Sequence, residues 1–162
     1  VGSELSPIAI AECFAERNLT AERISVATQS AAGVFIRHAS GSYEIFAGDA
    51  LLLTPELLGP VQAAYDRAAL VALPPPMRER YAQHFATLMP AGSRTLLIAF
   101  EYDQAIKDGP PFSVEPDEVQ RLYRDFFRVE ELERVDIIGE SPKFAATGLD
   151  ALHEVAYSLT RR

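Results

Sequence analysis

The sequence predicts an α/β fold: a doubly wound, mostly parallel sheet with an antiparallel C-terminal strand. Apolar segments of strand length alternate with segments patterned as helices, which is typical of this class. Residues 95–100, TLLIAF, form a continuous apolar run that indicates a central parallel strand covered on both faces. Two later strands, at residues 127–136 and around residues 153–159, have a loop but no helix between them. We therefore expect them to pair antiparallel at the edge of the sheet.

A strand end and a helix start open the chain. Residues 1–6 are predicted to form the end of a strand, with Glu4 at its carboxyl end. Ser6 followed by Pro7 is the pattern of a helix N-cap with proline in the first helical position. Apolar residues continue at helical spacing as far as Ala15, so a helix is expected to begin at Pro7.

The next segments are predicted to form a hairpin and a short helix. Residues 25–33 are rich in Ala, Ser, Thr and Gln, which indicates an irregular link. Residues 33–37 and 43–47 are predicted to be two strands joined by a glycine-containing turn. Further on, Thr54 followed by proline interrupts an apolar segment and indicates a helix start.

A pair of opposite charges, Asp66 and Arg67, follows the predicted strand at residues 63–66. Two helical stretches come next, separated by prolines at residues 74–76, and the second covers residues 77–88. Ligands of open α/β sheets bind beyond the carboxyl ends of the strands, so the charged pair is a candidate site. The pair also fits a helix-start carboxylate beside a solvated charge, without any function.

Residues 108–112, DGPPF, form a second candidate segment. Two consecutive prolines restrict the backbone, which suits a rigid wall beside a ligand. A simple turn between two elements explains the same residues equally well. A helix is expected to begin near Pro116.

The composition excludes several classes of function. The chain has 162 residues, of which 48% are hydrophobic and 23% charged, so we expect one globular domain over residues 1–162. A formal net charge of -8 leaves no basic face for nucleic acid or an anionic membrane. The single cysteine, Cys13, is expected to be a small buried hydrophobe in a reducing, cytoplasmic compartment. No histidine or cysteine spacing indicates a metal site, and no apolar run is long enough to cross a bilayer.

Six segments together carry a resemblance to a known family. They are GSELS at residues 2–6, AGDALLLTPELLGP at residues 47–60, YDRAALVALPPPMRERYAQH at residues 65–84, LLIAFEYDQ at residues 96–104, GPPFSV at residues 109–114 and the closing HEVAYSLTRR. In this order they resemble the thiopurine S-methyltransferase family, close to its bacterial branch. The combination of DRAALVALP, EYDQ and GPPFSV is the specific part of the resemblance.

The resemblance implies a class I methyltransferase with a Rossmann-like sheet that uses S-adenosyl-L-methionine. It implies direct in-line transfer of the methyl group to a small-molecule thiol, such as a thiopurine, or to a selenium or tellurium analogue. The family also implies a monomer. On the family's pattern, Glu4 binds the cofactor's ribose and Asp49 and Ala50 lie against its adenine. Arg67 lies beside its methionine end and also reaches the acceptor, whose pocket is walled by Pro110, Pro111 and Phe112.

Two features depart from the family's pattern. Its opening strand and glycine-containing loop are absent, so we expect the domain to be N-terminally incomplete. If the protein truly starts at Val1, weak or no cofactor binding is expected, and the neighbours of the missing central strand should expose apolar edges. Animal members place an arginine near residues 139–147, where Lys143 is the nearest cation here.

Two other functions stay open at this stage. Glu4 after a strand would also hold the ribose of a nicotinamide cofactor, as in an NAD-dependent dehydrogenase. The antiparallel final strands and the DRAALVAL segment argue against that enzyme. The other alternative is a truncated α/β binding module without a cofactor.

Overall fold

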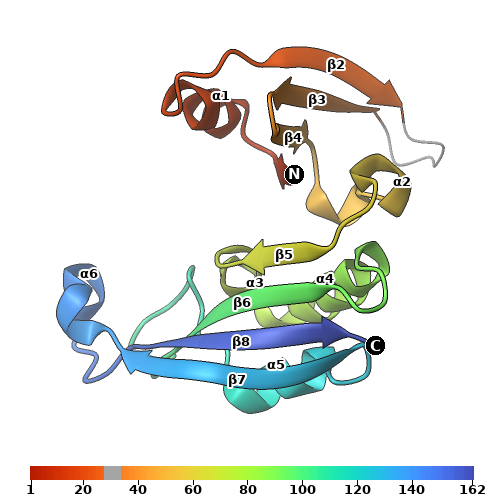
Figure 1. Ribbon diagram of the computed structural model, residues 1–162. Helices are drawn as coiled ribbons and strands as arrows, with labels where there is room; N and C mark the ends of the chain where they lie inside the picture. Colours follow the sequence, from red (N-terminus) through yellow and green to blue (C-terminus); the bar gives the residue numbers. More distant parts are fainter. Residues whose placement is uncertain (28–33) are drawn as a thin grey trace. The chain divides into compact units, whose positions relative to one another are not determined.

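The computed structural model describes residues 1–27 and 34–162, which form two compact units (Figure 1). The first unit is Val1–Gly59 and the second is Pro60–Arg162. Each unit contains helices and a four-stranded sheet, which confirms the α/β class. The expectation of one domain over residues 1–162 stays a prediction.

The sheet of the first unit has the strand order β1-β4-β3-β2. Strand β1 is parallel to β4, and the other two pairings are antiparallel. The elements are β1 (Gly2–Glu4), α1 (Pro7–Ala15), β2 (Glu22–Ala27), β3 (Val34–Ser40), β4 (Tyr43–Ala47), the short 3-10 helix η1 (Ala50–Leu52) and α2 (Pro55–Leu58).

Local sequence signals explain most of these elements. The backbone N–H of Ala9 donates to the Ser6 hydroxyl at 3.2 Å, so the predicted N-cap of α1 is confirmed. The predicted hairpin is confirmed as β3 and β4, and Gly41 has the positive φ of 58° that its tight turn requires. The helix start at Thr54 is also confirmed, because Leu57 N–H donates to its hydroxyl at 3.4 Å.

Strand β2 contradicts the expectation of an irregular link. It includes Ser25, which pairs with Ile36 of β3, and it extends to Ala27. Pairing with a neighbouring strand satisfies the backbone and overrides the polar composition of this segment. The rest of the expected link, residues 28–33, lies outside the described residues.

The sheet of the second unit has the strand order β5-β6-β8-β7. Only the β5–β6 pairing is parallel. The elements are β5 (Ala63–Asp66), α3 (Ala69–Ala72), α4 (Pro75–Leu88), β6 (Arg94–Glu101), α5 (Pro116–Tyr123), β7 (Phe127–Asp136), the 3-10 helix η2 (Ile138–Glu140), α6 (Pro142–Ala145) and β8 (His153–Arg161).

The end of the chain confirms one prediction and corrects another. Strands β7 and β8 pair antiparallel, with β7 at the sheet edge, as the sequence predicts. The segment between them is not a plain loop, because it contains η2 and α6. Pro142 in the first helical position of α6 explains why a short helix begins there.

The core of the second unit lies between one face of its sheet and helices α3, α4 and α5. Leu97 and Ala99 of β6 are fully buried in this core, together with Leu70 of α3 and Val119 of α5. Leu96, which points to the other face, is 41% exposed. The expectation that β6 is covered on both faces is therefore wrong at this position.

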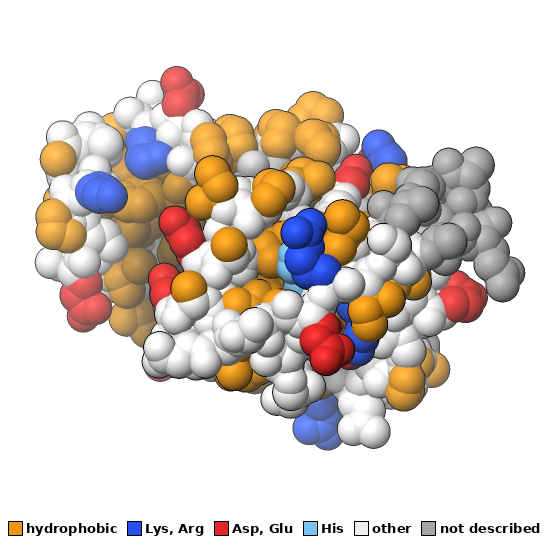
Figure 2. Space-filling model, turned by 90° about the horizontal axis from the view of Figure 1, so that it is seen from above, with side chains coloured by type: hydrophobic (Ala, Val, Ile, Leu, Met, Phe, Trp, Pro, Cys, Tyr) orange, Lys and Arg blue, Asp and Glu red, His pale blue; other side chains and the backbone are white. Residues whose placement is uncertain are grey.

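Apolar side chains also reach the surface of the first unit. On the face that Figure 2 shows, hydrophobic side chains are more widespread than charged ones. Leu5 and Ile8 are among the exposed large hydrophobic residues. Scattered apolar residues are ordinary on protein surfaces, so we assign no site to them. None of the described helices has both the length and the apolar character needed to cross a membrane.

The contact between Gly48 and Phe35 gives a test of the first unit's packing. A Cβ atom on Gly48 would lie 2.4 Å from the buried ring of Phe35, which packs edge-on against Phe46. We expect Gly48→Ala to lower the free energy of unfolding by about 1–3 kcal/mol, measured by urea denaturation, because the ring must shift. Gly139→Ala is the control, since nothing lies within 4 Å of its Cβ. Equal stabilities of the two variants would contradict this packing.

Candidate active site

The carboxylate of Asp66 is buried at the end of β5, with the residue only 6% exposed. Its Oδ1 accepts from the backbone N–H of Ala69 at 3.1 Å and of Leu70 at 3.4 Å. Its Oδ2 accepts from the Tyr81 hydroxyl at 2.8 Å. Burial raises the pKa of Asp66, and these hydrogen bonds oppose part of the rise. Asp66 therefore fits the interpretation as a helix-start carboxylate, which the sequence offered as one of two. Its hydrogen bonds stabilise the first turn of α3.

Arg67, the next residue, points to solvent instead. Its side chain is 61% exposed and donates to Glu154 of β8 at 3.5 Å. A long, exposed ion pair of this kind contributes little to stability. The guanidinium is therefore accessible for a ligand.

Arg67 lies at a cavity of about 530 Å³ that is within the usual size range of ligand pockets. Apart from this one cation, every lining side chain is apolar. The lining residues are Arg67, Ala68, Val71, Ala72, Phe100, Pro110 and Pro111. The structure thus brings together three of the predicted site residues, Arg67, Pro110 and Pro111.

Sequence reasoning missed the other four lining residues. Ala68, Val71 and Ala72 belong to the DRAALVAL segment, from which only Arg67 was expected to contribute. The available signal was helical spacing, because Val71 follows Arg67 by one turn. Phe100 lies near the carboxyl end of β6, the strand that pairs in parallel with β5.

The wall segment, residues 109–113, is fixed by hydrogen bonds to its neighbours. The Phe112 N–H donates to the Val71 carbonyl at 2.7 Å. The Tyr102 hydroxyl donates to the Pro111 carbonyl at 2.6 Å. The Phe112 ring is not among the side chains that line the cavity, and it lies 5.8 Å from the Arg78 guanidinium.

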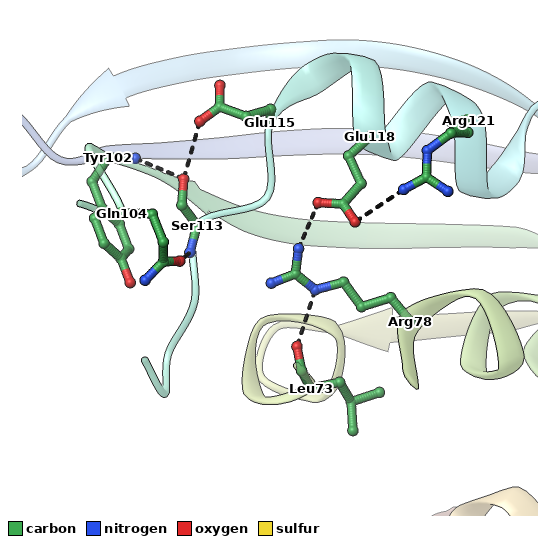
Figure 3. A network of polar contacts seen from close by, with 8 residues as sticks. All are labelled: Leu73, Arg78, Tyr102, Gln104, Ser113, Glu115, Glu118 and Arg121. Atoms are coloured by element: carbon green, nitrogen blue, oxygen red, sulfur yellow. Dashed lines mark hydrogen bonds and ion pairs between the residues drawn. The ribbon is translucent and has the colours of Figure 1, made fainter. Parts of the chain in front are cut away.

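Ser113 anchors the end of this wall (Figure 3). Its N–H donates to Gln104 Oε1 at 2.8 Å, and its hydroxyl accepts from the Tyr102 N–H at 3.0 Å. The same hydroxyl lies 3.2 Å from Glu115 Oε1, to which it donates. The EYDQ and GPPFS segments therefore form one bonded unit. These contacts favour the rigid-wall interpretation of residues 108–112 over a simple turn.

The remaining predicted site residues lie in the first unit. Glu4 ends β1 and is paired in register with Ala47 of the parallel strand β4. Its Oε1 accepts from the Ser6 N–H at 2.7 Å. Asp49 follows β4, so the carboxylates of Glu4 and Asp49 come from the carboxyl ends of neighbouring parallel strands.

Asp49 also holds a local turn. Its Oδ1 accepts from the Leu51 N–H at 2.9 Å, which caps η1, and Ala50 is the first residue of that helix. Both carboxylates of this sheet edge are thus oriented by backbone N–H groups. Within the described residues, no group of three or more His, Cys, Asp or Glu side chains is arranged to hold a metal ion.

A second cavity of about 350 Å³ in the second unit is lined by Glu101, Asp103, Glu115 and His153, among others. Three of these acidic groups already have partners: Glu101 pairs with Arg134, Asp103 accepts from a backbone N–H, and Glu115 accepts from Ser113. We therefore assign it no ligand. Lys143 lies in the last turn of α6 and lines neither cavity.

The whole chain, residues 1–162, matches the protein family described as thiopurine S-methyltransferase. It is 43% identical over 162 residues to the thiopurine S-methyltransferase of Bordetella petrii, covering 100% of this chain and 71% of that protein. It is 44% identical over 159 residues to that of Methylococcus capsulatus, covering 98% of this chain and 69% of that protein.

A solved structure, that of the [4+2]-cyclase SpnF, has a similar fold. It aligns with a TM-score of 0.54 at 14% identity and covers 99% of this chain and 65% of its own chain.

The raised pKa of Asp66 predicts how stability depends on pH. A carboxyl group with a raised pKa binds its proton more tightly in the folded state than in the unfolded state. Its contribution is therefore largest below the ordinary value of 3.8 and is lost as the pH rises through the raised value. We expect the wild type to lose free energy of unfolding relative to Asp66→Asn as the pH rises above the ordinary value of 3.8 and through the raised pKa. Denaturant titrations at several pH values measure this difference.

Two further variants complete this test. Asp66→Ala should lower the free energy of unfolding by about 1–3 kcal/mol, because the Tyr81 hydroxyl and two N–H groups lose their acceptor. Asp125→Asn is the control, since that side chain is 79% exposed. A wild type that gains stability over Asp66→Asn with rising pH would contradict the raised pKa.

Proposed function

Since the chain belongs to the thiopurine S-methyltransferase family, we propose that it methylates the sulfur of small aromatic or heterocyclic thiols with S-adenosylmethionine as donor. The observation that carries the choice of acceptor is the apolar cavity with one cation, Arg67, among its lining residues. An apolar lining favours a planar organic thiol over a small, strongly hydrated selenium or tellurium anion.

The strand ends of the first unit have suitable chemistry for the cofactor. A carboxylate accepts up to about four hydrogen bonds, and Glu4 uses Oε1 for one from Ser6. It retains capacity for the two hydroxyls of a ribose, and we assign it to them. Asp49 and Ala50 are assigned to the adenine. When bound, S-adenosylmethionine supplies a methyl group on a positively charged sulfur that becomes neutral on transfer.

Arg67 has the central role in activating the acceptor. We assign its guanidinium to the methionine end of the cofactor and to the acceptor sulfur. A cation beside a thiol lowers the pKa of that thiol and so raises the fraction present as thiolate, the reactive form. The exposure of the side chain makes this effect moderate, because water screens it. A thiol that is already ionised needs no general base.

The wall residues contribute orientation and exclusion of water. Pro110 and Pro111 line the cavity, and we assign them to the acceptor ring. Phe112 fixes their segment through its N–H bond to Val71. Holding the thiolate in line with the methyl group and away from water accounts for most of the expected rate acceleration.

The pH dependence of methyl transfer tests the role of Arg67. We expect Arg67→Gln to lower kcat/KM about tenfold at pH 7 for a thiol whose pKa is above 8, and to shift the pH of half-maximal kcat/KM upward. For a heterocyclic thiol that is already ionised at pH 7, the loss should be smaller. Mass spectrometry of the methylated product measures both rates.

The matched control for this test is Arg94→Gln. Arg94 is an exposed arginine at the other end of β6, away from the cavity. Equal losses with both acceptors, or the same loss in Arg94→Gln, would contradict thiolate stabilisation by Arg67. A wild type that methylates no thiol at all would overturn the proposed function itself.

A further inference from the structure

We propose that Arg78 and Tyr81 of α4 form a clamp that positions residues 66–73, four of which line the cavity, for the methyl acceptor. The two side chains lie one helical turn apart and bond to opposite ends of that segment. This inference rests on the proposed function, because it assigns the clamp a role in acceptor recognition. Neither residue lines the cavity, so both are positioning residues.

Helix α3 depends on bonds from outside because it is short. It has four residues, and its own N-cap residue, Ala68, makes no side-chain cap. A single helical turn is not stable by itself, since nucleation of a helix is unfavourable. The place of the cavity-lining residues on this turn therefore depends on contacts from outside it, and those at its two ends are among them.

Tyr81 holds the first end. Its hydroxyl donates to Asp66 Oδ2 at 2.8 Å, while Oδ1 of the same carboxylate accepts from the first N–H groups of α3. The ring of Tyr81 is itself fixed by stacking on Phe85, with 6.0 Å between the ring centroids. Tyr81 thus fixes the orientation of Asp66, the residue immediately before Arg67.

Arg78 holds the second end (Figure 3). Its Nε donates to the carbonyl of Leu73 at 3.0 Å, just beyond α3. Its Nη1 donates to Glu118 of α5 at 2.5 Å, and Glu118 also accepts from Arg121. The guanidinium therefore joins the end of α3 to α5.

Arg78 also lies near the wall segment, residues 109–113. Its guanidinium lies 5.8 Å from the ring centroid of Phe112, whose N–H donates to Val71 of α3 at 2.7 Å. The residue is 1% exposed, and its Nη2 has no hydrogen-bond partner in the described part of the chain. An arginine with an unpaired buried nitrogen is a poor source of stability. We infer that the role of Arg78 is to fix α3 and the wall segment relative to each other.

The test measures acceptor selectivity in Arg78→Lys and Tyr81→Phe. We expect each change to raise KM for a bicyclic aromatic thiol about tenfold, with kcat and S-adenosylhomocysteine affinity changed less than about twofold. KM for a two-carbon thiol should change much less, because binding of that small acceptor does not depend on contacts with both α3 and the wall segment. Arg80→Lys, exposed on the same helix, and Tyr43→Phe in the first unit are the matched controls.

Amide hydrogen exchange gives a readout that does not depend on activity. In Arg78→Lys, exchange at the Phe112 N–H should accelerate at least about tenfold, while the Val114 N–H, bonded to Phe100 at 2.7 Å, keeps its protection. Glu118→Gln should show a smaller effect of the same kind, because it weakens only one of the arginine's bonds.

Several results would overturn the clamp. One is a lower melting temperature with unchanged selectivity between the two thiols and unchanged Phe112 exchange, which would make Arg78 merely structural. Equal acceleration at Phe112 and Val114 would indicate general loosening instead. If the wild type methylates no thiol, the proposed function fails, and unchanged Phe112 exchange in Arg78→Lys would then reject the clamp independently.

Discussion

The buried carboxylate of Asp66 is the constraint on which the second unit's cavity depends. A buried carboxyl group in this position requires hydrogen-bond partners around it, and the chain supplies them from two helices. Because two of the donors are the first backbone N–H groups of α3, this helix begins directly after β5. Because the third donor is the Tyr81 hydroxyl, α4 lies with Tyr81 facing the end of β5. The position of Arg67 beside the cavity follows from this arrangement, since it lies between Asp66 and α3.

The charge distribution of the protein explains why the single cation Arg67 can determine whether the cavity prefers a thiolate. With a net charge of -8, the protein as a whole does not attract anions, so any preference for a thiolate must arise locally. Arg67 is the one cation among otherwise apolar lining side chains, and water screens part of its field because its side chain is exposed. In the second cavity, three of the four lining carboxylates already have partners, including Glu101 with Arg134. The site therefore combines an apolar body with one accessible positive charge.

Much of the fold could be predicted because local signals agree with the structure. Ser6 with Pro7 marks the start of α1, and the 127–136 strand matches β7. Strand β2 could not be predicted, because its pairing with β3 overrides its polar composition. In the candidate site, the DRAALVAL and GPPF segments both supply residues that line the apolar cavity. The orientation of Phe112 toward Arg78 could not be read from sequence, since arginines in helices are usually exposed and only long-range packing buries this one.

The claim that this chain binds a methyl donor is tested most directly by calorimetric titration with S-adenosylhomocysteine. For a protein that includes the family's opening strand and glycine-containing loop, we predict binding in about the micromolar range, weakened at least about tenfold in Glu4→Gln. That variant keeps an oxygen for the Ser6 N–H, so the fold is expected to persist. Glu12→Gln, exposed on α1, should bind like the wild type. No binding by the wild type, or equal binding by Glu4→Gln, would contradict the account.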